Sequence, residues 1–192
     1  MSAAAPKPRV LLGLTGSVAS TKAKELVGLL ISFAEVKVVK TAAAAHFFET
    51  DALVGQGCEV YGDADDWHSW EKKGDPVLHI DLRKWADLLV IAPLSANTLA
   101  KITSGVCDNL LTSVVRAWDF GKPMLVAPAM NTFMWDSPFT AKQLNVLREL
   151  GVHVMEPVSK TLACGDTGKG ALPPPLEIAN RCRTLLCVGS DR

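Results

Sequence analysis

Short apolar runs recur along this chain, and polar or glycine-containing segments separate them. The strongest run is residues 87–92, Asp-Leu-Leu-Val-Ile-Ala, which has the continuous apolar character of a strand buried on both faces. Shorter or alternating runs predict further strands at residues 9–14, 35–40, 58–61, 124–127 and 152–155.

Segments with helical patterns lie between these strands. They are residues 16–32, 42–48, the segment capped by Ser95, and residues 108–118, 140–150 and 177–186. Strands that alternate with helices of this length imply a parallel sheet covered on both faces. We therefore expect one α/β domain with a Rossmann-like (flavodoxin-like) sheet over residues 9–188, after a flexible N-terminal extension of residues 1–8.

Composition narrows the class of protein. Twenty basic and twenty acidic residues give zero formal net charge, which argues against nucleic-acid binding. The start of the chain lacks the apolar core of a signal peptide, no apolar stretch is long enough to span a bilayer, and the five cysteines include no CxxC pair. We expect a soluble, cytoplasmic protein with reduced thiols and no membrane partner. The hydrophobic content of 48% hints at oligomerisation, although buried parallel strands would raise it too.

Two polar segments follow predicted strands and open predicted helices. Residues 13–20 carry Ser17 in a glycine-containing turn, and residues 93–98 carry hydroxyls and an amide after the strongest strand. Backbone N–H groups at helix starts bind anions, so two such ends on one sheet suit a mononucleotide lying across the strand tips, with Thr41 adding a third hydroxyl. The pattern is neither GxGxxG nor a Walker loop, and ordinary capped helices would explain each end equally well.

Two further segments indicate chemistry on a small substrate. Asn131 follows the apolar run at residues 124–127, where open α/β sheets bind ligands. Cys164 lies among glycines that allow close backbone approach and movement. A free cysteine usually packs as a small hydrophobe, but these neighbours do not make a core.

Residues 16–19, 93–98, 128–131 and 164–166, in this order, resemble the motifs of the flavin-containing cysteine decarboxylases. The likeness runs from about residue 8 to residue 170 and is strongest to the plant-type phosphopantothenoylcysteine decarboxylases. It implies a homotrimer with the active site at the subunit interface, and the cofactor FMN. The positions that the resemblance assigns to FMN are Gly16, Ser17, Val18, Ala19, Thr41, Phe47, Ser95, Ala96, Asn97, Thr98 and Ala129.

The resemblance also implies roles for the remaining site residues. His79 corresponds to the family's active-site base, although a lone histidine between apolar residues is more often a hydrogen-bonded core residue. Cys164 corresponds to the proton donor on a flap that closes on the substrate. Substrate contacts are expected from Asn131, Arg83 and Ala163, and Lys84 stands where near relatives tend to carry a second arginine.

The implied activity is FMN-dependent decarboxylation of 4′-phosphopantothenoylcysteine to 4′-phosphopantetheine, a step of coenzyme A biosynthesis. The alternatives are a peptidyl-cysteine decarboxylase, a phosphatase inhibitor-like regulatory protein on the same fold, and a flavin prenyltransferase. Residues 59–70 hold several acidic side chains but lack the pattern of a calcium loop, so we expect a solvated acidic loop anchored by its tryptophans and no metal.

Overall fold

The computed structural model describes residues 6–161 and 167–189. Its centre is a six-stranded parallel sheet in the order β3-β2-β1-β4-β5-β6. The bounds of its strands are β1 Arg9–Leu14, β2 Glu35–Lys40, β3 Glu59–Tyr61, β4 Leu88–Leu94, β5 Met124–Pro128 and β6 His153–Val154. The six predicted strands and the α/β fold class are confirmed, with the first two strands correct at both ends.

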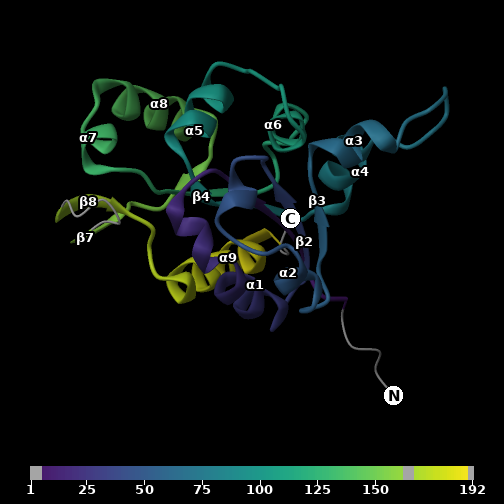
Figure 1. The fold of residues 1–192 in the computed structure, drawn as a ribbon, viewed down its shortest axis with the longest axis horizontal. Helices are drawn as coiled ribbons and strands as arrows, with labels where there is room; N and C mark the ends of the chain where they lie inside the picture. The colour runs from purple at the N-terminus through teal and green to yellow at the C-terminus, as the bar shows by residue number, and fades with distance from the viewer. Residues whose placement is uncertain (1–5, 162–166, 190–192) are drawn as a thin grey trace.

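Helices cover both faces of this sheet (Figure 1). One face carries α1 and α9, and the other carries α5, α6 and α8. The helix bounds are α1 Ala23–Ile31, α2 Asp51–Val54, α3 Asp63–His68, α4 Leu78–Trp85, α5 Ala96–Thr103, α6 Leu110–Arg116, α7 Thr132–Trp135, α8 Pro138–Glu149 and α9 Pro175–Gly189. Two 3-10 turns, η1 Val18–Lys22 and η2 Ala44–His46, follow β1 and β2. The helix predicted at residues 42–48 is therefore a single turn.

Two hydrophobic clusters lie on opposite sides of the sheet. Leu26 of α1 and Ile178 of α9 belong to the first cluster, and Leu111 of α6 and Leu147 of α8 belong to the second. Strands β1 and β4 contribute side chains to both, and residues 88–94 are all buried. Burial on both faces explains why the central strands have continuous apolar sequences.

Several elements were not expected from the sequence. Helices α3 and α4 follow β3, and an antiparallel hairpin of β7 Val158–Thr161 and β8 Thr167–Ala171 follows β6. Figure 1 shows α3 and α4 at one end of the long axis of the molecule and the hairpin at the other. The proline run at residues 173–175 leads directly into α9, where proline suits the first helical position. In the described part of the chain, no helix has the length and apolar character required to cross a membrane.

Candidate active site

The site is built on the carboxyl ends of β1, β4 and β5. The connection after β1 leads to α1 on one face, whereas the connection after β4 leads to α5 on the other, so the sheet changes winding direction between these adjacent strands. Buried Thr15 joins the two ends, since its hydroxyl donates to the Pro93 carbonyl (2.7 Å) and accepts from the Ser95 N–H (2.8 Å). The two polar segments singled out in the sequence are thus neighbours.

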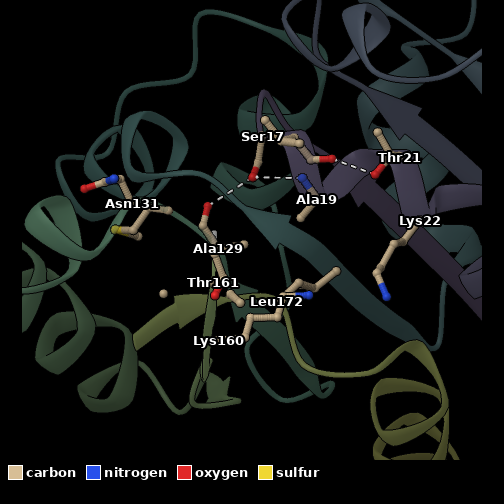
Figure 2. A pocket seen from close by; sticks show the side chains of 13 residues that line it. Ser17, Ala19, Thr21, Lys22, Ala129, Asn131, Lys160, Thr161 and Leu172 are labelled. Carbon is tan, nitrogen blue, oxygen red and sulfur yellow. Dashed lines mark hydrogen bonds between the residues drawn. The ribbon is translucent and has the colours of Figure 1, made fainter. Parts of the chain in front are cut away.

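One cavity of about 330 Å³ opens beside the start of η1. Ser17, in an extended conformation, caps that turn: its Oγ accepts from the Ala19 N–H (3.3 Å) and donates to the Ala129 carbonyl (3.2 Å), as Figure 2 shows. The walls come from the first turn after β1, the loop after β5 and the hairpin. The lining residues are Ser17, Val18, Ala19, Thr21, Lys22, Ala129, Met130, Asn131, Lys160, Thr161, Gly170, Ala171 and Leu172.

A second cavity of about 310 Å³ lies at the start of α5. Ser95 caps this helix by accepting from the Thr98 N–H (3.3 Å), and the first N–H groups of a helix have no carbonyl partner within it. Gly16 permits the tight wall opposite, because a Cβ there would lie 2.6 Å from the Cβ of Ala43. The lining residues are Gly16, Thr41, Ala42, Ala43, Asp63, Ser95, Asn97, Thr98, Lys101, Asp108 and Asn109.

Sequence reasoning missed the charged rim of this second cavity. Lys101 Nζ lies 2.6 Å from Asp108 Oδ2, and this hydrogen bond lowers the pKa of the Asp108 carboxyl. Asp63 Oδ1 accepts from the Leu110 N–H (3.0 Å) at the start of α6. These residues come from three different elements, so no local sequence pattern connects them.

Asn131 lies on the wall of the first cavity and caps the short helix α7, with its Oδ1 accepting from the Phe133 N–H (2.8 Å). The hairpin is held against the same loop, because the Met130 N–H donates to the Gly170 carbonyl (2.9 Å). Cys164 and Ala163 lie outside the described residues, in the connection between β7 and β8. Their neighbour in sequence, Thr161, lines the first cavity.

The structure does not bring His79 and Arg83 to these cavities within one chain. Both lie on α4, and neither lines either cavity. His79 faces Asp66, with Nδ1 at 3.0 Å from Oδ1. Arg83 donates through Nε to the Ala117 carbonyl (2.9 Å), and its Nη2 lies 3.6 Å from Asp119 Oδ2. Phe47 and Ala96, also expected at the cofactor, line neither cavity.

The acidic segment at residues 59–70 corrects one prediction. It forms β3 and α3 rather than a loop, and its tryptophans do not anchor it, since Trp67 is 80% exposed and Trp70 is 53% exposed. Asp66 pairs with His79 instead of facing solvent. Among the residues that the structure describes, no cluster of His, Cys, Asp and Glu side chains is arranged to hold a metal ion.

Comparison with known proteins identifies the family. The model of the family described as Flavoprotein matches residues 1–186. This chain belongs to the Flavoprotein family. A relative of this flavoprotein, the phosphopantothenoylcysteine decarboxylase of Oryza sativa subsp. japonica, is 54% identical over 181 residues, which cover 94% of this chain and 81% of the relative.

Two solved structures are similar in fold to this flavoprotein over most of both chains. A cysteine-to-serine mutant of PPC decarboxylase complexed with pantothenoylaminoethenethiol has a TM-score of 0.91 at 53% identity, covering 93% of this chain and 97% of that one. The FMN binding protein AtHal3 has a TM-score of 0.87 at 54% identity, covering 93% and 96%. The resemblance inferred from the sequence motifs is confirmed.

The two cavities of this flavoprotein fit the two halves of FMN. The cavity at α5 offers hydroxyls and the start of a helix, whose first N–H groups have no carbonyl partner within the helix, and both suit a phosphate. The cavity at η1 is walled by small and aliphatic residues such as Val18, Ala129 and Leu172, which suit a flat ring system. Because Gly16 lines one cavity and Ser17 the other, a single mononucleotide can extend across this turn.

Proposed function

We propose that this protein is an FMN-dependent decarboxylase that converts 4′-phosphopantothenoylcysteine to 4′-phosphopantetheine. The observation that carries the proposal is the pair of cavities at the switch point between β1 and β4. A helix start that suits a phosphate lies beside an apolar cavity that suits a ring system, and Asn131 lines the wall of the latter. The relatives named above support the same substrate.

FMN, when bound, would supply the oxidation of the cysteinyl CH₂–SH unit that makes loss of CO₂ feasible, and the returning hydride. The chain's own residues hold the substrate and move its protons. Asn131 is assigned to the substrate carboxylate, because this residue lines the wall of the first cavity. His79 is assigned the role of proton acceptor, and Cys164 that of proton donor after CO₂ has left.

His79 and Cys164 can act on one substrate only if two copies of the chain meet. His79 lies on α4, at one end of the long axis, and the hairpin that flanks Cys164 lies at the other (Figure 1). A head-to-tail contact between copies would join these ends, and repetition of such a contact forms a ring where the rotation between copies closes. We therefore infer a homotrimer with a shared site at each interface.

Exposed apolar side chains at both ends support this assembly. Trp67, Trp70 and Val77 lie near the α4 end, and Phe133, Met134 and Phe139 lie near the hairpin end. These side chains are between 38% and 80% exposed in the single chain. Apolar groups gathered on a surface mark interaction sites, and contact between the two ends would cover both groups.

Purification followed by a visible spectrum and an assay with 4′-phosphopantothenoylcysteine tests the activity. We expect a yellow protein, release of CO₂ and a product with the mass of 4′-phosphopantetheine. A peptide with a carboxyl-terminal cysteine serves as the competing substrate, and turnover of this peptide alone would identify a peptidyl-cysteine decarboxylase. A colourless protein that acts on neither substrate would refute the proposal.

Complementation tests the shared site. We expect His79→Asn and Cys164→Ser to form no 4′-phosphopantetheine alone but to form it when co-expressed, because a mixed ring contains sites with one intact residue from each neighbour. Random mixing would restore about a quarter of the sites. Sedimentation should give three times the 20.6 kDa chain mass. An inactive mixed ring would show that both residues come from one chain.

A further inference from the structure

A carboxylate on α3 holds the ring of His79. Asp66 Oδ1 lies 3.0 Å and Oδ2 lies 3.1 Å from His79 Nδ1. The Asp66 side chain is only 15% exposed and that of His79 is 30% exposed, so the pair is partly withdrawn from water. The two residues are 13 positions apart, and the packing of α3 against α4 brings them together.

The same carboxylate also holds the backbone of His79. Its Oδ1 accepts from the His79 N–H at 3.3 Å, in the first turn of α4. Val77, at the cap position of α4, provides no side-chain hydrogen bond to this helix. Asp66 thus fixes both the helix start and the imidazole, which leaves the ring little freedom to rotate.

This contact selects the form of the imidazole. A carboxylate accepts hydrogen bonds and donates none, so the ring nitrogen that faces it must carry the hydrogen. In a neutral imidazole only one nitrogen is protonated. A hydrogen on Nδ1 therefore leaves the lone pair on Nε2, the nitrogen on the other side of the ring.

We propose that Asp66 is a positioning residue that holds His79 in the Nδ1–H tautomer and directs a basic Nε2 toward the substrate. The proposal rests on the proposed function, in which His79 accepts a proton. It adds a second residue to that role, one that does not touch the substrate. A carboxylate that only capped α4 would require neither contact to Nδ1.

Asp66→Asn gives the sharpest test. The carboxamide keeps an oxygen that can cap α4, but its NH₂ group can donate to Nδ1 and so favour the Nε2–H tautomer. The corresponding change in the serine-protease triad lowers kcat by about 10⁴ through the wrong tautomer. We expect Asp66→Asn to lower kcat by about 10² or more while KM stays close to that of the wild type.

Two matched variants separate positioning from folding. Asp65→Asn changes the neighbouring carboxylate, which accepts from the Gly62 N–H (2.7 Å) and caps α3 without contacting His79. We expect this variant to keep normal kcat. Asp66→Glu restores a carboxylate on a longer arm, and we expect it to regain most of the activity that Asp66→Asn loses.

Nitrogen NMR of the FMN-loaded protein reads the tautomer directly, with the His79 signal assigned by its loss in His79→Gln. We expect hydrogen on Nδ1 in the wild type and in Asp66→Glu, and on Nε2 in Asp66→Asn. An Nε2–H tautomer in the wild type would overturn the proposal, and so would an Asp66→Asn enzyme with normal kcat. If the wild type decarboxylates neither substrate, the proposed function fails, while the NMR result still decides whether Asp66 sets the tautomer.

Discussion

The structure predicts a specific effect for the replacement of Gly170 in the hairpin. It has φ +148°, and a Cβ added there would lie 2.3 Å from the Met130 carbonyl oxygen, which is part of the backbone and cannot rotate away. Gly170 also accepts the Met130 N–H hydrogen bond that holds the hairpin against the loop before Asn131. Gly170→Ala should therefore move the hairpin away from the first cavity.

Two free-energy costs and one displacement set the size of the effect of Gly170→Ala on the hairpin and on turnover. A non-glycine residue in this backbone region costs about 1–3 kcal/mol. Loss of the Met130–Gly170 hydrogen bond costs about 1 kcal/mol. Carbon and carbonyl oxygen approach to about 3.3 Å, so the strand must also shift by roughly 1 Å, a displacement that can reduce turnover about 100-fold. We expect a hairpin destabilised by about 2–4 kcal/mol, with the sheet intact.

Gly151→Ala is the matched control. Gly151 has φ +80° at the end of α8, and a Cβ there would meet nothing within 4 Å. Gly151→Ala therefore introduces backbone strain without a clash, at a position that does not line the first cavity. Both variants should be compared in hydrogen exchange of the Met130 amide, FMN occupancy and turnover.

We expect fast exchange at Met130 and roughly 100-fold lower turnover in Gly170→Ala, and neither change in Gly151→Ala. If the Met130 amide stays protected in Gly170→Ala and turnover matches that of Gly151→Ala, the hairpin does not depend on this close approach. The reasoning about the cavity wall would then be wrong.

Three further predictions concern other parts of the chain. Cys164→Ser should keep FMN and release CO₂ but accumulate the enethiol form of the product, because a hydroxyl is a weaker acid than a thiol. His79→Asn should release no CO₂. Formation of the normal product by Cys164→Ser would contradict the first expectation. Ser17→Asp should keep the helix cap but reduce FMN occupancy by at least about tenfold, because its carboxylate cannot donate to the Ala129 carbonyl and brings a charge into the cavity that suits the flavin ring. The flavin absorbance of the purified variant would reveal the loss. Burial and the positive charge of Arg181 lower the pKa of the His153 imidazole below its ordinary 6.5. As pH falls, the unfolded chain therefore takes up this proton before the folded chain does, and the folded state loses stability as pH falls through 6.5. His153→Gln should therefore flatten the fall in melting temperature between about pH 7 and pH 5, and parallel curves for the two proteins would rule this out.

The sequence by itself determined the sheet and the capped helix starts that follow its strands. Residues 9–14 were located at both ends because a strand buried on both faces has a nearly continuous apolar sequence. Residues 35–40 were located because their buried valines alternate with less buried charged residues. Capping is equally local: Ser17 and Ser95 act on N–H groups two and three residues away. Three of the four family motifs lie at or just after the carboxyl ends of β1, β4 and β5, and each is a short contiguous segment that can be recognised in the sequence.

Only the tertiary structure showed that the site consists of two cavities and which residue contacts His79. The Asp66–His79 pair depends on α3 packing against α4, and Asp66 looked like part of a solvated acidic segment until that packing was known. Arg83, which is expected at the substrate, donates to the Ala117 carbonyl of its own chain, and this contact spans 34 positions. Periodicity and capping depend on residues within one turn or one strand. These contacts depend instead on how whole helices and strands pack against one another, and no local sequence pattern encodes that packing.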